Sequence, residues 1–153
     1  MVPNPAYFGV HTLPALEGFP ITGIKISAYP DLINALAASK QAAELANQEL
    51  GLLEPHLADA IVQTCIQIRQ DRYHDQFLVD VLQGSAGPST NKNALELLGF
   101  GKGDYNELHP NEHVNLSQST NDVYPTALKI ASHIGVLRLI DAMEVLRAAF
   151  HEK

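Results

Sequence analysis

Apolar residues recur at spacings of three and four positions in three stretches of the chain, residues 30–50, 55–70 and 121–152. This spacing puts the apolar side chains on one face of a helix, so it predicts three helices. Only a short loop separates the first two helices. We therefore expect them to lie antiparallel and side by side.

Local signals mark the ends of the first two predicted helices. Pro30 and Pro55 suit a first helical turn, where the missing N–H costs nothing. Gly51 stands where a left-handed residue commonly ends a helix. The predicted apolar faces consist of Leu32, Leu36, Ala43 and Leu50 in the first helix, and of Leu57, Ala60, Ile61, Thr64, Cys65 and Ile68 in the second.

The third predicted helix is long and apolar on several sides. Residues 121–152 would extend about 50 Å, at roughly 1.5 Å per residue. A helix with apolar residues on more than one side needs neighbours on more than one side. Its apolar positions include Ala127, Ile130, Ile134, Leu137, Met143, Leu146 and Phe150, with Leu128, Val136, Leu139, Ile140 and Val145 on other faces.

The remaining stretches, residues 1–29 and 71–118, lack helical periodicity. Region 71–118 is predicted to be mostly irregular, with one short helical piece around Asn93–Leu98. The expected fold class is mainly α, with a short β segment near the start. In the first region we predict β-prone stretches at Tyr7–Thr12 and Ile21–Ser27, and turns near Pro14 and Gly18.

Charge and composition argue against nucleic acid and membranes as partners. The formal net charge is −7, so no basic surface for nucleic acid is expected. No stretch of about 18 apolar residues predicts a membrane span, and the start of the chain lacks a signal-peptide pattern. The single cysteine, Cys65, is predicted to be a small buried helical residue, which fits a reducing cytoplasm. The seven histidines show no metal-ligand spacing and no cysteine joins them, so no catalytic metal is expected. No cofactor is expected either.

A polar cluster directly precedes the third helix. It comprises His109 to Asn115 and the run Ser117-Gln118-Ser119-Thr120-Asn121-Asp122. A helix N-terminus offers unpaired N–H groups and a partial positive charge, so hydroxyl and amide groups there form a natural carboxylate site. The simpler interpretation is that these residues only cap the helix. One cap, however, needs one such residue, and here four stand in a row.

The run from Ser117 to Ala127 closely resembles the S-x-S/T-N-D-x-x-P-T-A signature of the aspartase/fumarase family. Other segments resemble the same family in the same order, over nearly the whole chain. These segments are Tyr7–Thr12, Lys25–Ser27, Asp75–Phe77, Lys102–Tyr105, His109–Asn111 and His113–Asn115.

The resemblance implies a fold and an activity. Residues 1–118 would form the family's amino-terminal domain, and residues 119–153 the first long helix of a central helical bundle in a homotetramer. The implied reaction is the reversible elimination of ammonia from L-aspartate, giving fumarate. Ser119 and Thr120 would bind the β-carboxylate, and Asn121 would contact the amino group or the α-carboxylate. His109 and Asn111 resemble a second carboxylate site, although a histidine bonded within its own loop explains His109 as well.

The chain also departs from the family pattern. It stops at Lys153, before the mobile loop with the general-base serine, so no catalytic residue is present and the chain is expected to be inactive alone. The substrate loop reads Ala86-Gly87-Pro88, where the family has threonine in place of proline. About two helical turns are missing between Asn91 and Gly99.

Two other functions stay open. A fumarate hydratase segment is the first. The run Ser119-Thr120-Asn121 and the run Gly9-Val10-His11-Thr12 resemble aspartases more than fumarases, and within Ser-Thr-Asn a single hydroxyl residue, Thr120, makes the difference. A non-catalytic helical oligomerisation module is the second. The apolar faces of residues 121–152 and the missing hydroxyl at Pro88 favour that alternative for the isolated chain.

Overall fold

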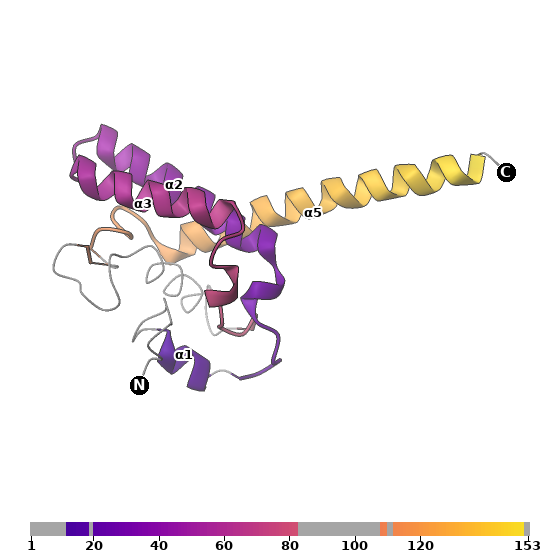
Figure 1. Cartoon of the computed structure of the whole chain (residues 1–153), viewed down its shortest axis with the longest axis horizontal. Coiled ribbons are helices and arrows are strands. Elements are labelled where there is room, and N and C mark those ends of the chain that lie inside the picture. Colours follow the sequence, from indigo (N-terminus) through magenta and orange to yellow (C-terminus); the bar gives the residue numbers. More distant parts are fainter. Residues whose placement is uncertain (1–11, 19, 83–107, 110–111, 152–153) are drawn as a thin grey trace.

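The structure, a computed structural model, describes residues 12–18, 20–82, 108–109 and 112–151 (Figure 1). Four α-helices and two 3-10 turns make up this part of the chain. In chain order they are α1 (Leu13–Gly18), η1 (Ile26–Ala28), α2 (Pro30–Glu49), α3 (Pro55–Arg69), η2 (His74–Gln76) and α5 (Thr120–His151).

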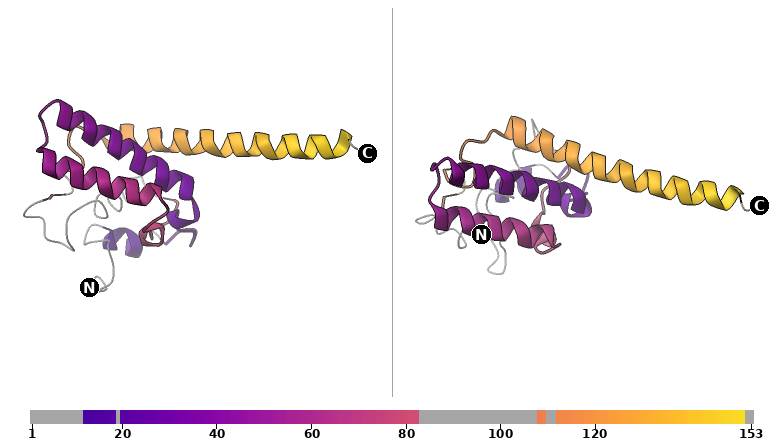
Figure 2. Two further views of the ribbon diagram at one scale, coloured as in Figure 1. Left: turned by 45° about the horizontal axis from the view of Figure 1, so that its top comes forward. Right: turned by 90° about the horizontal axis from the view of Figure 1, so that it is seen from above.

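Helices α2 and α3 form the predicted hairpin, lying side by side in every view (Figures 1 and 2). Each begins with its proline, as expected. Gly51 follows the last residues of α2 with a φ of +68°, which confirms the predicted left-handed helix end.

Helix α2 is the centre of the described structure, because it packs against α3 on one side and against the first part of α5 on another (Figure 2). Cys65 is fully buried, as predicted. The shared apolar core is built mainly from α2 and α3 and is closed by residues from the connecting segments. Its largest fully buried apolar side chains are Ile26, Ile33, Leu36, Ile61, Ile68, Phe77, Val79, Leu108 and Val114.

Helix α5 starts against α2 and then runs far beyond it (Figure 1). Its buried residues, Val123 and Ala127, both lie near its start. An ion pair between Arg138 and Asp31 marks a late contact with α2. The apolar residues that the sequence places on several faces are exposed in the chain alone: Leu128, Ile130, Val136, Leu137, Leu139, Ile140, Met143, Val145, Leu146 and Phe150.

The start of the chain differs in part from the prediction. Pro14 and Gly18 lie in helix α1, not in turns, because Pro14 falls in the first helical turn, where proline is tolerated. Among the residues that the structure describes, β-pairing is limited to one bridge between Lys25 and Asp80. The Asp80 side chain also accepts hydrogen bonds from Thr22, Gly23 and Leu82 at 2.7–2.9 Å.

Other predictions fall outside the described residues. They concern the β-prone stretch at residues 7–11 and the helical piece at 93–98. Within the described residues, no helix combines the length and the apolar character needed to cross a membrane.

We expect Gly51→Ala to destabilise the chain by about 1 kcal/mol, because alanine disfavours the left-handed backbone that ends α2. Gly135→Ala is the matched control, since a Cβ at this helical glycine of α5 meets open space. The control should be neutral or stabilising. Urea unfolding followed by circular dichroism measures both changes. Equal effects at the two positions would contradict the role of Gly51 as the left-handed residue that ends α2.

Candidate site at the start of helix α5

Ser119, Thr120 and Asn121 lie together where α5 begins, as the sequence predicts for a helix N-terminus. The Ser119 carbonyl accepts the first helical hydrogen bonds, from the N–H groups of Asp122 at 3.0 Å and Val123 at 2.9 Å. The Ser119 hydroxyl oxygen accepts a bond from the N–H of Asn121 at 3.2 Å. Ser119 is therefore the cap of α5.

Capping and anion binding are compatible at this position. The hydroxyl oxygen of Ser119 accepts one bond within the cap, but its own O–H is a separate donor. Ser119 and Asn121 are exposed, and Thr120 is half-buried. Hydroxyl and amide donors thus gather at the positive end of a 32-residue helix. Such an arrangement suits a carboxylate.

Pro125 lies within α5. The helix begins at Thr120, so Pro125 is its sixth residue, beyond the first turn. Proline has no N–H, and the carbonyl of Asn121 therefore lacks the usual donor from four residues ahead. Helix α5 continues through Pro125 to His151.

The turn before α5 is held by buried polar side chains of α2. The Lys40 ammonium donates to the Asn115 side-chain oxygen at 2.9 Å and to the Val114 carbonyl at 3.4 Å. The Asn47 amide donates to the Leu116 carbonyl at 3.0 Å. Lys40 is fully buried, so these bonds replace water around its charge.

Gln118 joins this turn to the third buried polar residue of α2, Glu44. Its amide nitrogen lies 2.9 Å from Glu44 Oε1, 3.2 Å from the Val114 carbonyl and 3.4 Å from the Leu116 carbonyl. The other carboxylate oxygen of Glu44 is buried without a hydrogen-bond partner among the described residues. Burial raises the pKa of Glu44 to about 7, although the Gln118 bond and the Lys40 charge oppose the rise. Burial also lowers the pKa of Lys40 to about 8.

The second predicted carboxylate site is only partly described. His109 forms hydrogen bonds within its own turn. Its ring Nδ1 accepts from the backbone N–H of Glu112 at 3.3 Å, and its backbone N–H donates to the ring Nδ1 of His113 at 2.9 Å. This agrees with a histidine bonded within its loop. Asn111 and the substrate loop Ala86-Gly87-Pro88 lie outside the described residues.

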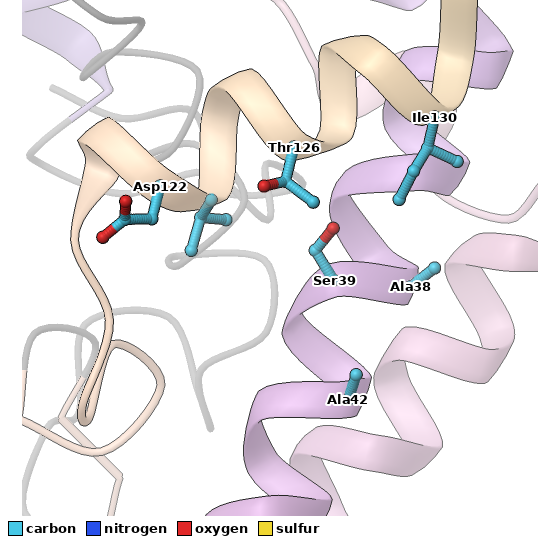
Figure 3. A pocket seen from close by; sticks show the side chains of 7 residues that line it. Ala38, Ser39, Ala42, Asp122, Thr126 and Ile130 are labelled. Carbon is cyan, nitrogen blue, oxygen red and sulfur yellow. The ribbon is translucent and has the colours of Figure 1, made fainter. Parts of the chain in front are cut away.

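A groove of about 340 Å³ runs between α2 and α5, close to the candidate site (Figure 3). Its lining is mostly apolar, and Figure 3 shows Thr126 of α5 opposite Ser39 of α2. Asp122 also lines it and would repel an anion. Ser119, Thr120 and Asn121 do not line this groove, so it is not the carboxylate site. Among the described side chains, no cluster of three or more His, Cys, Asp or Glu residues could hold a metal ion.

The buried row of Lys40, Glu44 and Asn47 was missed by the sequence analysis. A signal was available, because these residues recur at i, i+4 and i+7 and so share one face of α2. The predicted apolar face instead included Ala43, which is half-buried, and Leu50, which is exposed.

Ser119→Ala should destabilise α5 by about 1 kcal/mol, because it removes the acceptor for the Asn121 N–H. Ser119→Asp is the matched control, since aspartate also caps helices and should lose little stability. Circular dichroism during urea denaturation measures both variants. Equal stability of the Ala and Asp variants would show that Ser119 does not cap the helix.

Glu44 should make stability depend on pH. Between pH 4.5 and about 7, the folded chain holds a proton on Glu44 that the unfolded chain has released. The free energy of unfolding should therefore fall as the pH rises through this window, by up to about 3 kcal/mol. Lys40 remains charged across the window, because its pKa of about 8 lies above it.

Glu44→Gln should remove this fall, since glutamine does not titrate. Glu49→Gln, at an exposed position of the same helix, controls for the general loss of a negative charge. Urea denaturation at several pH values between 5 and 8 gives the comparison. If the free energy of unfolding of Glu44→Gln fell with pH as it does in the unchanged chain, the pH dependence would not come from the buried Glu44 carboxyl.

Comparisons with known proteins agree with the resemblance seen in the motif. The family model described as Lyase matches residues 1–153, the whole chain. An aspartate ammonia-lyase from Helicobacter pylori (strain J99) is 47% identical over 160 residues, which are 99% of this chain and 34% of that protein. The chain thus spans about a third of the length of the curated relatives it matches.

Solved structures show the same likeness. The native form of fumarate lyase:delta crystallin from Brucella melitensis has a TM-score of 0.97 and 42% identity, covering 100% of this chain and 36% of that chain. A recombinant class II fumarase from Schistosoma mansoni has a TM-score of 0.78 and 30% identity, and the match covers 85% of this chain and 29% of that chain. The chain therefore belongs to the lyase family, the aspartase/fumarase family that its run from Ser117 to Ala127 resembles.

Proposed function

We propose that the chain supplies the amino-terminal third of an aspartate ammonia-lyase, which eliminates ammonia from L-aspartate to give fumarate. The observation that carries this proposal is the placement of Ser119, Thr120 and Asn121 in consecutive positions at the start of α5. The 47% identity to the Helicobacter pylori enzyme supports the same activity.

The proposed reaction needs donors at this place. Removing a proton from the carbon beside a carboxylate puts extra negative charge on that carboxylate in the transition state. Preorganised donors that face the developing charge lower the barrier, because they need no reorganisation during the reaction. A capped helix N-terminus meets this requirement, since the Ser119 cap fixes the backbone that carries the donor side chains, and the helix dipole is in place before the substrate arrives.

Each polar residue of the site has a proposed part. Ser119 and Thr120 bind the β-carboxylate, and Asn121 contacts the amino group or the α-carboxylate. His109 and Asn111 form a second carboxylate site. The general base comes from a part of the enzyme that this chain does not include.

Assembly is part of the proposal. The exposed apolar faces of α5, from Val136 to Phe150, would be covered by neighbouring helices of the complete enzyme, in a cytoplasmic homotetramer. We propose that residues 1–118 form the amino-terminal domain and residues 119–153 the first helix of the central bundle. Helix α5 fits this division, because it packs on α2 as far as the Arg138–Asp31 ion pair and then runs beyond the hairpin (Figure 2).

A hybrid enzyme tests the proposal. Residues 1–153 would replace the matching segment of the Helicobacter pylori enzyme, and fumarate formation from aspartate would be followed by its absorbance. We expect turnover, reduced roughly tenfold to a hundredfold because Pro88 provides no hydroxyl to the substrate loop. Thr120→Val in the hybrid should lower kcat/KM by a further factor of about ten to a hundred. Thr126→Val, an exposed threonine one turn and a half further along α5, is the matched control and should change little.

The outcomes separate the alternatives. Turnover of malate with none of aspartate would replace the proposal by a fumarate hydratase. A hybrid that assembles as the parent does but stays inactive, even with Pro88→Thr, would contradict both activities. That result would favour a non-catalytic helical oligomerisation module, which the exposed faces of α5 also permit.

A further inference from the structure

We propose that Gln118 and the three α2 residues around it, Lys40, Glu44 and Asn47, are positioning residues for the carboxylate site. This inference rests on the proposed function, because it names the groups that fix the side chains assigned to the substrate. None of the four contacts the substrate in this proposal. They act through the turn that leads into α5 and through the first residues of that helix.

The three α2 residues hold the turn at well-separated points. Lys40, Glu44 and Asn47 lie on successive helical turns of one face, spread over about 10 Å of α2. Their exposed fractions are 0%, 0% and 3%. Lys40 binds at residues 114 and 115, Asn47 at residue 116 and Glu44 at residue 118. A single contact would let the turn rotate, whereas contacts spread along two helical turns fix both its place and its direction.

Gln118 is the link to the candidate site. Its amide nitrogen lies within 3.4 Å of three acceptors, one on α2 and two within the turn. The next residue is Ser119, the cap of α5, so a displacement of Gln118 passes to the cap through one peptide bond. Ser117 has a φ of +57°, a left-handed conformation that serine rarely adopts. Contacts from α2 hold the chain in this conformation.

Stability alone explains this row poorly. Taking a lysine and a glutamate out of water is unfavourable, and apolar side chains of similar size often stabilise a fold as well or better. The shifted pKa values of both groups reflect that unfavourable burial. On the α3 side, Cys65 faces the pair with its pKa raised by burial to about 12, so its thiol brings no neutralising charge. What the row adds is direction, because hydrogen bonds fix the angle of a turn and apolar contacts do not.

Steady-state kinetics of the hybrid enzyme test the inference. Gln118→Met keeps the length of the side chain and removes its donor, and should raise KM for aspartate about tenfold in fully folded enzyme. Gln63→Met, the same replacement at an exposed position of α3, is the matched control and should leave KM unchanged. A purely structural role predicts a lower Tm and yield with an unchanged KM, and that result would overturn the inference.

Glu44 provides a second comparison. Glu44→Gln keeps an oxygen that accepts from Gln118, whereas Glu44→Leu removes it. We expect a clearly smaller rise of KM in the Gln variant than in the Leu variant. Equal effects of the two substitutions would show that the hydrogen bond to Gln118 does not act in positioning.

Amide hydrogen exchange of the chain itself gives a readout that does not need activity. In Gln118→Met, the amides of Asp122 and Val123 should exchange about tenfold faster, because both bond to the Ser119 carbonyl at the start of α5. Amides within α3 should exchange as in the unchanged chain. Unchanged exchange at Asp122 and Val123 would overturn the inference even if the hybrid were active. A hybrid that assembles but stays inactive even with Pro88→Thr would overturn the proposed function alone, and exchange would still decide this inference.

Discussion

The contact between a buried polar row on α2 and the turn before α5 determines where the candidate site lies. Lys40, Glu44 and Asn47 project from one face of α2 and bond to side chains and carbonyls between residues 114 and 118. Two of the three carry ionisable groups that are fully buried. Such burial is unfavourable unless every contact is well placed. The same contacts connect two segments about 70 residues apart in the chain, so the site forms only when the hairpin has folded.

The site combines a fixed backbone with exposed side chains. Ser119 completes the helix end through its own oxygen atoms, and its exposed hydroxyl can still donate a hydrogen bond. Because the helix beyond it is 32 residues long, the full helix dipole acts at this end. The exposed apolar faces of α5 provide a surface on which other helices can pack.

Much of the fold could be predicted from the sequence, because α2, α3 and α5 follow strong helical periodicity with clear end signals at Pro30, Pro55 and Gly51. The sequence also placed the polar cluster correctly at the start of a long helix, where Ser119 caps α5. The buried row of Lys40, Glu44 and Asn47 could not be predicted. Periodicity distinguishes apolar from polar faces of a helix, and a polar face is ordinarily expected to contact water. Whether a lysine is buried depends on partners 70 or more residues away, which local patterns do not contain. The α1 helix was missed for a related reason, because a proline near a glycine predicts a turn and also suits a short helix.

A crystal structure of the hybrid enzyme with succinate, an unreactive dicarboxylate of the same length as aspartate, tests directly whether the start of α5 binds a carboxylate. We expect one succinate carboxylate at the start of α5, with its oxygens about 2.7–3.1 Å from donors of Ser119, Thr120 and Asn121. A succinate bound elsewhere in the active site, with these three side chains turned toward solvent, would contradict this expectation.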